Sequence, residues 1–436
     1  MSRIVIPQMK KQGKGAIVNI ASTAHLTPMP LVAVYCATKR YVRWLSLAME
    51  RELFKYNITV QCVTPAFVRT ELLQFSNILS RNKFVGTPVE MYARSAVFTL
   101  GKTQETTGYW THAMLSCQHS CSQNEDYDIF LGFFSSMSTF YEMLLSTINL
   151  VGLLATVSFL YDNFKSLFSI LKAVLEPYFR PQLPHTLPEK FGKWAENLCK
   201  TEVKWIVADF SKGKAVYEHI KKELLDIPIG ILVNNVGCAS HPDELCNRSE
   251  DWLWNIINLN VGAVTLMSRI VIPQMKKQGK GAIVNIASTA HLAPMPLLAV
   301  YSATKRYVRS LSLTMERELL KHNITVQCVE PWFVRTELTQ FSETLSRGMF
   351  FGTPVEAFTR SAVFTLGKTQ ETTGYWTHAI MVKFLLYAII YKLKKEQFQS
   401  FHLSLLPEWL RIRISHAFTD YLRKEWLKKQ VEEKEK

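Results

Sequence analysis

Tyr301 and Lys305, which bound the pentapeptide Tyr-Ser-Ala-Thr-Lys, are a pair of side chains suited to acid–base chemistry. They stand four residues apart, a spacing that places both on one face of a helix, one turn from each other. An ammonium group near a phenol favours the phenolate and lowers a pKa that is ordinarily about 10. Such a phenol can give a proton to a bound substrate or take one from it. Taken alone, the spacing also fits an ordinary solvated helix face.

Ser288 lies thirteen residues before Tyr301 and adds a third polar group. It ends the mostly apolar run Gly281–Ser288, whose composition predicts a buried strand. A hydroxyl at the end of a strand and a Tyr/Lys pair on a helix can converge on one carbonyl group. We therefore predict a catalytic group made of Ser288, Tyr301 and Lys305.

An internal repeat accompanies this group. Residues 1–113 recur as residues 267–379 without gaps, and the two copies differ at only about 18 positions. The first copy opens inside a helix and repeats only the second half of the pattern, so we predict a partial half-domain that is inactive by itself. The counterparts of the catalytic group in this copy are Ser22, Tyr35 and Lys39.

Strand-like and helix-like segments alternate over residues 189–379, the order that a parallel sheet with crossover helices requires. This predicts an α/β fold with a Rossmann-like, doubly wound parallel sheet. The connection over 331–352 is long and rich in aromatic residues, which indicates a functional loop. Strands are expected at 203–210, 229–236, 282–287, 324–329 and 372–379, and helices at 212–226, 249–278, 299–321 and 354–366.

Together with Ser288 and the Tyr-Ser-Ala-Thr-Lys pentapeptide, the segment Asn234-Asn-Val-Gly237 resembles the motifs of the short-chain dehydrogenase/reductase family. Within that family the chain is similar to the membrane-bound branch of 17-beta-hydroxysteroid dehydrogenases and 3-oxoacyl-CoA reductases. The resemblance implies NADP(H)-dependent reduction of a 3-oxoacyl-CoA or a 17-ketosteroid, and it makes the 331–352 loop a substrate lid. The segments that indicate this branch are 206–211, 231–237, 372–378 and 407–410.

The resemblance also implies a role for each matching residue. Tyr301 would protonate the developing alkoxide, Lys305 would lower the pKa of Tyr301 and bind the nicotinamide ribose, and Ser288 would hydrogen-bond the substrate carbonyl. Asn260 would support a water link to the lysine. His291 and its twin His25 are interpreted as lid-base or surface residues. The residues expected to contact the cofactor are Asp209, Asn234, Asn235, Gly237, Pro331 and Thr336.

The sequence departs from the family at the phosphate-binding loop. After the lead-in at 191–195, where the family has a Thr-Gly-x-x-x-Gly-Ile-Gly loop, the chain continues with Glu-Asn-Leu-Cys-Lys, and no glycine-rich loop occurs elsewhere. The first βαβ unit is therefore missing, and we expect NADP(H) binding and activity to be impaired in this chain, because such a loop supplies backbone N–H groups to the pyrophosphate. The alternative function is a non-catalytic, membrane-tethered pseudoenzyme or interaction protein.

Residues 143–161 carry no charge and are long enough to cross a bilayer as a helix. Acidic residues precede this run and basic residues follow it, so the positive-inside tendency places the downstream domain in the cytosol. By resemblance the membrane is that of the endoplasmic reticulum, with the mitochondrion as the alternative. The expected organisation also includes a junction at 114–136, an anchor and linker at 137–188, and an apolar and basic tail at 380–436.

The net charge of +15 is spread along the chain, and no nucleic-acid-binding motif accompanies it. We therefore expect a membrane surface and a hydrophobic small molecule as partners, not nucleic acid, together with a possible homodimer through the face of the catalytic helix. The eight cysteines show no paired framework, which suggests reduced thiols. Cys117, His119 and Cys121 lack a second ligand pair, so no metal site is predicted.

Overall fold

The computed structural model describes most of the two repeated copies and one C-terminal helix. The proposed membrane span at 143–161, the junction, the linker and the cysteines at 117 and 121 lie outside the described residues. So does most of the predicted tail before residue 408. The described residues are 2–26, 29–70, 87–100, 102–109, 111–113, 206–347, 352–379 and 408–434.

The second copy is built on a four-stranded sheet in the order β6-β7-β8-β9, and every pairing in it is parallel. The parallel α/β fold predicted from the alternating pattern is therefore confirmed. Val and Ile occupy much of the central strands, which have the apolar composition expected of strands covered on both faces. The strands are β6 (Ile231–Asn234), β7 (Gly281–Ile286), β8 (Ile324–Val329) and β9 (Glu371–Thr372).

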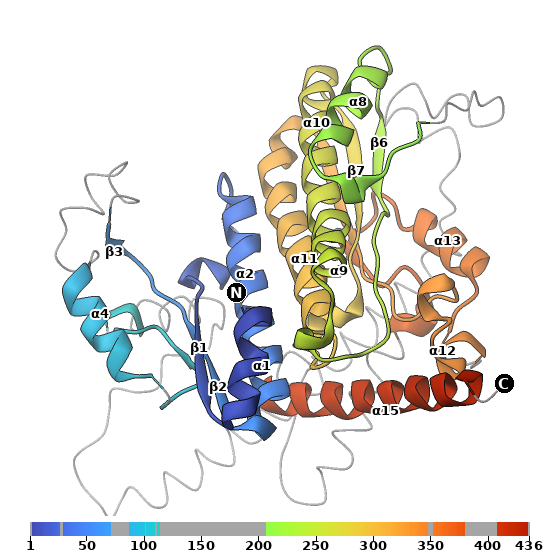
Figure 1. Cartoon of the computed structure of the whole chain (residues 1–436). Helices are drawn as coiled ribbons and strands as arrows, with labels where there is room; N and C mark the ends of the chain where they lie inside the picture. Colours follow the sequence, from blue (N-terminus) through green and yellow to red (C-terminus); the bar gives the residue numbers. More distant parts are fainter. Residues whose placement is uncertain are drawn as a thin grey trace, which may run out of the picture.

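Helices connect these strands as crossovers (Figure 1). The predicted 249–278 helix is continuous through Pro273 but contains a π-helical turn, η7 (Asn258–Gly262), between α9 (Glu250–Ile257) and α10 (Ala263–Gln278). The other elements of this copy are η5 (Phe210–Lys212), α8 (Ala215–Glu223), η6 (Leu245–Asn247), η8 (Thr289–Leu292), α11 (Ala299–Leu319), η9 (Leu320–His322), η10 (Glu337–Thr339), α12 (Glu343–Arg347) and α13 (Val355–Phe364).

The first copy forms a smaller parallel sheet in the order β1-β2-β5, beside a separate β3-β4 pair. Its longest helix is the counterpart of α11. The elements are α1 (Ser2–Gln12), β1 (Gly15–Ile20), η1 (Thr23–His25), α2 (Ala33–Leu53), η2 (Phe54–Tyr56), β2 (Ile58–Val63), β3 (Val68–Arg69), β4 (Thr87–Pro88), α4 (Val89–Phe98) and β5 (Glu105–Thr106).

The two copies pack on each other through α2 and α11, which lie side by side in Figure 1. Both hydrophobic cores draw residues from the two copies. Ala33 and Ala37 of α2 belong to the core of the second copy, and Leu245, Ile256 and Val300 of the second copy belong to the core around α1 and β1. The described parts of the two copies therefore share their buried apolar surface.

The C-terminal helix α15 (Glu408–Lys434) crosses beneath the second copy in the view of Figure 1. Arg423 forms an ion pair of 2.8 Å with Asp243, and the Trp426 ring stacks on His241 at a centroid distance of 3.6 Å. Glu425 accepts hydrogen bonds from the Ser342 hydroxyl and the Thr344 backbone N–H at the start of α12. The helix thus joins the loop after β6 to the loop after β8.

Two predicted strands differ from the structure. Residues 206–209 have no regular structure and 210–212 form η5, so the described part of the 203–210 strand is wrong. The 372–379 strand is also wrong beyond Thr372, because β9 pairs with β8 over only Cys328–Val329 and the chain then turns into helical residues 376–379. A strand forms only where its backbone pairs with a neighbour, and the pattern of a single segment does not report that pairing.

Among the described helices, Glu250–Gln278 is long enough to cross a membrane, and its most apolar window of 18 residues has a mean hydropathy of 1.5. In this fold it is the crossover between β6 and β7. Its buried residues Val264 and Val271 lie in the shared core, as expected for a helix packed inside a folded domain. The helix is consequently weak support for a membrane span.

Candidate active site

Ser288 follows β7 and begins η8. Its hydroxyl accepts a hydrogen bond of 3.2 Å from the Ala290 backbone N–H, which caps this short helix and fixes the side chain. The same hydroxyl lies near enough to the Tyr301 phenol to lower the pKa of that phenol slightly. The end of the strand and the first turn of α11 therefore bring Ser288 and Tyr301 together, as the sequence predicts.

The pKa of the Tyr301 phenol is raised above its ordinary value, mainly by burial, and the nearby Ser288 hydroxyl only partly offsets this. Burial therefore outweighs the lowering of the pKa that the sequence leads us to expect from Lys305. The Lys305 ammonium lies 5.8 Å from the centre of the Tyr301 ring. At pH 7 Tyr301 is consequently a neutral proton donor.

Lys305 is 7% exposed, and its Nζ donates a hydrogen bond of 3.1 Å to the Ile286 carbonyl at the end of β7. Burial lowers the pKa of this lysine to about 8. The lysine thus sits behind Tyr301 against the sheet and is still mostly charged at pH 7. Its position one helical turn from Tyr301 agrees with the four-residue spacing.

Asn260 lies in the π-helical turn η7 and is 2% exposed. Its side chain accepts from the Cys238 N–H at 2.8 Å, donates to the Cys238 carbonyl at 3.0 Å, and donates to the Thr304 hydroxyl at 3.1 Å. Asn260 therefore fastens the segment after β6 to the residue preceding Lys305. π-Helical turns are often found at functional sites, where they redirect a side chain.

The six residues expected to contact the cofactor separate into two groups. Gly237 lies at the site: a Cβ built there would be 3.1 Å from Asn260 Oδ1 and 3.4 Å from Lys305 Nζ. Each of the other five forms a hydrogen bond within the protein through a side-chain or backbone group. Asn234 donates to Asn285 and Ser268, Asp209 accepts from Ser211, Pro331 accepts from Thr289, Thr336 bonds Thr339, and the Asn235 N–H bonds Val233.

The residues available to a nicotinamide dinucleotide therefore differ between the two ends of the cofactor. At one end Gly237 permits a close backbone approach beside Lys305, Asn260 and Tyr301, which suits a nicotinamide ribose. At the other end of the cofactor, a phosphate loop would precede residue 206, where the described part of this region begins. The sequence contains no glycine-rich turn that could form such a loop. The residues present fit the nicotinamide end of the cofactor and do not supply its pyrophosphate site.

The first copy repeats the local geometry of the catalytic group. Lys39 Nζ donates to the Ile20 carbonyl at 3.1 Å and lies 5.7 Å from the centre of the Tyr35 ring, and the Ser22 hydroxyl caps η1 through Ala24. Tyr35, however, is 41% exposed. The segments that hold Gly237 and Asn260 precede the repeat, so the first copy has the same three residues without these neighbours.

His291 is 1% exposed, which corrects the interpretation of this residue as lid-base or surface. Its Nδ1 lies 2.6 Å from the Ser288 carbonyl, and its Nε2 lies 3.7 Å from the Glu330 carboxylate, which pairs with Arg309 at 2.9 Å. Burial holds the pKa of His291 well below its ordinary value. Its twin His25 is also buried, at 6% exposed, although Thr64 stands at the position of Glu330 in the first copy.

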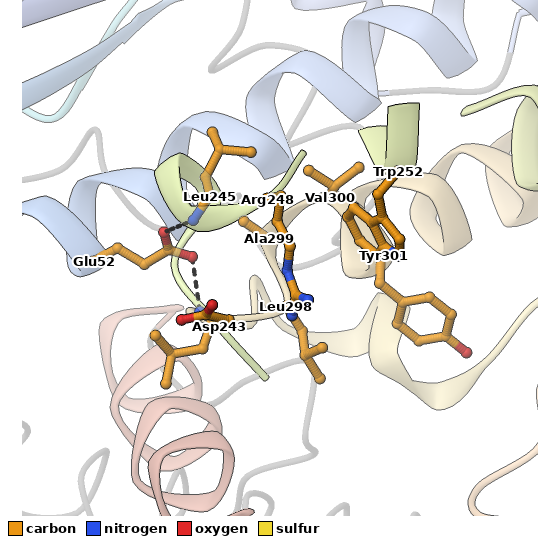
Figure 2. A pocket seen from close by; sticks show the side chains of 10 residues that line it. Glu52, Asp243, Leu245, Arg248, Trp252, Leu298, Ala299, Val300 and Tyr301 are labelled. Atoms are coloured by element: carbon orange, nitrogen blue, oxygen red, sulfur yellow. Dashed lines mark hydrogen bonds between the residues drawn. The ribbon is translucent and has the colours of Figure 1, made fainter. Parts of the chain in front are cut away.

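A pocket of about 260 Å³, part of it open to solvent, adjoins the first turn of α11. Figure 2 shows Tyr301 on one side of it and Glu52, from the first copy, on the other. Glu52 was not predicted as a site residue. The lining residues are Glu52, Asp243, Leu245, Arg248, Trp252, Leu297, Leu298, Ala299, Val300 and Tyr301.

The family model described as "short chain dehydrogenase" matches residues 1–78 and 188–345, which together are more than half of the chain. The chain belongs to this family. The matched ranges contain the Ser/Tyr/Lys set of both copies.

Curated relatives of this family member fall into two kinds. It is 38% identical over 229 residues to "Hydroxysteroid dehydrogenase-like protein 1" of Gallus gallus, covering 52% of this chain and 64% of that protein. The same values hold for "Inactive hydroxysteroid dehydrogenase-like protein 1" of Homo sapiens. It is 33% identical over 252 residues to "Very-long-chain 3-oxoacyl-CoA reductase" of Rattus norvegicus, covering 57% of this chain and 70% of that protein.

The chain thus spans less than two thirds of the length of the chicken and human relatives. Among solved structures, a short-chain dehydrogenase from Sphingobium yanoikuyae in complex with NADPH is similar at 25% sequence identity. That match covers 48% of this chain and 81% of the bacterial one, with a TM-score of 0.39.

Proposed function

We propose that this chain is an NADP(H)-dependent oxidoreductase that reduces a carbonyl group of a lipid, either a 3-oxoacyl-CoA or a 17-ketosteroid. The observation that supports this most directly is that Ser288 lies near the Tyr301 phenol, with Lys305 buried one helical turn from Tyr301. A neutral phenol beside a hydroxyl is a ready proton donor to a carbonyl oxygen. The substrate class is taken from the relative named a very-long-chain 3-oxoacyl-CoA reductase.

Nicotinamide, when bound, supplies the hydride in this class of chemistry. The chain's own residues then have three tasks. Ser288 donates a hydrogen bond that orients the carbonyl oxygen, Tyr301 delivers its proton to that oxygen as negative charge develops, and Lys305 provides nearby positive charge that stabilises the phenolate left behind.

The proposed setting is the endoplasmic reticulum membrane, with the active site in the cytosol and the mitochondrion as the alternative. The uncharged run at 143–161 would be the anchor. A hydrophobic substrate fits this setting, because a steroid or fatty acyl chain partitions into the bilayer near the site. Trp332 and Phe333, 5.2 Å apart at the start of the proposed lid, provide an apolar surface for such a substrate.

A second candidate function is a non-catalytic, membrane-tethered protein that keeps the fold for interactions. The specific observation in its favour is that the sequence has no glycine-rich loop, while Asp209 and Asn234, expected near the adenosine, use their side chains for internal hydrogen bonds. In this case the Ser/Tyr/Lys group would be intact but without a bound nicotinamide.

The duplicated chain offers a matched test of the enzymatic proposal. Tyr301→Phe removes the proton donor, so we expect it to lower NADPH-dependent reduction of a 3-oxoacyl-CoA or a 17-ketosteroid by at least about 100-fold. Tyr35→Phe makes the same change outside the site and should leave the rate unaltered. Full-length protein that binds NADPH but turns over equally in both variants would refute Tyr301 as the donor, and no NADPH binding would favour the non-catalytic candidate.

A further inference from the structure

The packing of α2 on α11 relates the two copies by reciprocal contacts. The Glu52 carboxylate on α2 accepts a hydrogen bond of 2.7 Å from the Leu297 N–H in the second copy. In return, the Glu318 carboxylate on α11 accepts a hydrogen bond of 2.7 Å from the Leu31 N–H in the first copy. Glu52 matches Glu318 in the repeat, and Leu31 matches Leu297. The two hydrogen bonds are therefore equivalent, like the paired contacts between identical subunits of a symmetric dimer.

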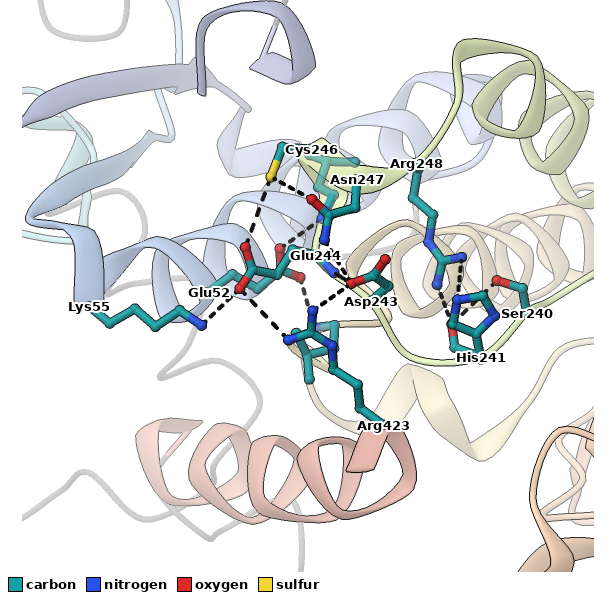
Figure 3. Close-up of polar contacts among 12 residues, drawn as sticks. Glu52, Lys55, Ser240, His241, Asp243, Glu244, Cys246, Asn247, Arg248 and Arg423 are labelled. Carbon is teal, nitrogen blue, oxygen red and sulfur yellow. Dashed lines mark hydrogen bonds and ion pairs between the residues drawn. The ribbon is translucent and has the colours of Figure 1, made fainter. Parts of the chain in front are cut away.

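The two carboxylates nevertheless lie in different surroundings. Glu52 is 2% exposed and accepts a second hydrogen bond of 3.2 Å from the Leu245 N–H, whereas the bond from Leu31 to Glu318 is at the surface. Leu245 precedes the repeat, so the first copy has no matching residue. Burial raises the pKa of Glu52 to about 7, and the two backbone hydrogen bonds partly counteract it. Figure 3 shows Glu52 beside the charged cluster of Glu244, Lys55 and Arg423.

Leu297 needs an external partner because its backbone is in the left-handed region, with φ at +67°. A leucine rarely adopts this conformation, and such residues persist only where their surroundings hold them. Leu31, which meets Glu318, has φ at +69°. Each left-handed leucine is thus paired with a carboxylate from the other copy.

Leu297 lies just before the catalytic helix. Its carbonyl accepts from the Asp243 N–H at 2.8 Å, so Glu52 and Asp243 together fix both of its backbone polar groups. The helix begins at Ala299, and its N-cap residue, Leu298, forms no side-chain cap. Tyr301 is in the first turn of this helix.

We propose that the first copy acts as a built-in partner subunit whose Glu52 is a positioning residue, holding Leu297 and Leu245 so that Tyr301 is placed for catalysis. The inference deepens the proposed function, since it concerns how the proton donor of that site is held. It assigns the duplicated half a purpose that does not require its own Ser22, Tyr35 and Lys39 to react.

The test compares Glu52→Gln with Glu318→Gln in the full chain. Glutamine keeps the size of the side chain but loses the charge and one acceptor, so we expect backbone hydrogen exchange at Leu297 and Leu245 to rise about tenfold in Glu52→Gln. The reciprocal variant should raise exchange at Leu31 alone. If Glu52→Gln does not fold, Glu52→Asp keeps the charge with a shorter reach and is measured instead.

A second readout separates positioning from simple loss of stability. In protein labelled at the tyrosine ring carbon Cζ, the Tyr301 resonance is the one absent from Tyr301→Phe. We expect Glu52→Gln to shift this resonance and to lower the apparent pKa of the phenol toward the ordinary value, while Glu318→Gln leaves both unchanged. An unaltered Tyr301 resonance with unaltered Leu297 exchange would overturn the proposal. Neither measurement needs turnover, so this failure is distinct from failure of the proposed activity.

Discussion

At the scale of single residues, the buried state of Lys305 makes a prediction about pH. Its pKa of about 8 is below the ordinary 10.5, so between these values the unfolded chain holds a proton that the folded chain has lost. Stability therefore rises with pH in this window. Relative to Lys305→Met, the wild-type chain should gain up to about 3 kcal/mol in free energy of unfolding between about pH 8 and about pH 10.5, measured by urea titration.

Lys39→Met is the matched control for this measurement. Lys39 makes the same hydrogen bond in the first copy but is less enclosed, and its pKa is lowered in the same direction by burial. Its contribution to the pH dependence should be smaller. If Lys305→Met and the wild type follow the same pH profile, Lys305 is not a buried lysine that titrates near neutrality.

The residue types and spacing of the catalytic group could be predicted because helix period and strand ends are local properties. Ser288, Tyr301 and Lys305 meet for that reason. The raised pKa of Tyr301 could not be predicted, since it depends on burial by segments distant in sequence. Glu52 could not be identified either, because 245 residues separate it from Leu297 and no local pattern links the two.

At the scale of elements, α15 is expected to hold the start of α12. The Glu425 carboxylate accepts hydrogen bonds of 2.8 Å from the Ser342 hydroxyl and 3.0 Å from the Thr344 N–H. Glu425→Gln removes a charged acceptor, and hydrogen bonds to charged groups contribute about 1.5–3 kcal/mol. We predict faster backbone hydrogen exchange over residues 342–346, measured by mass spectrometry, with little change in the central strand β8.

The control lies one residue away on the same helix. Lys424→Gln breaks an exposed ion pair with Asp420, of the kind that contributes little to stability. It should leave exchange at 342–346 as in the wild type. Equal exchange in both variants would mean that α15 does not fasten α12.

The long helices of both copies were predictable to within a few residues, because each has a sustained apolar period, as α11 illustrates. The π-helical turn η7 was not, although it sets the position of Asn260. The short strand β9 and residues 206–210 were over-predicted, since the length of an edge strand is set by pairing with its neighbour.

At the scale of the whole molecule, α2 covers a face of α11 that the sequence-based hypothesis of a homodimer would use. The shared cores and the reciprocal glutamate contacts indicate that the first copy of the same chain covers this face of α11. We predict a particle of one chain, 50.1 kDa, by light scattering after correction for any bound detergent. A particle of about twice that mass would support the homodimer hypothesis instead.

The repeat itself is evident in the sequence, but how the two copies dock is not. Docking depends on which faces are apolar in three dimensions and on differences such as Trp44 in place of Ser310, where the Trp44 ring receives the Arg306 guanidinium at 4.4 Å. A sequence comparison treats these positions as ordinary substitutions.

Whether this chain transfers hydride is tested most directly with NADPH carrying deuterium at the reactive carbon of nicotinamide. The full-length protein is incubated with a 3-oxoacyl-CoA or a 17-ketosteroid, and the product is examined by mass spectrometry. We predict a hydroxyl product with one deuterium at the former carbonyl carbon from the wild type and from Tyr35→Phe, and at least about 100-fold less of it from Tyr301→Phe in the same time. Absence of labelled product from the wild type, with both substrate classes and saturating NADPH, would contradict the enzymatic account.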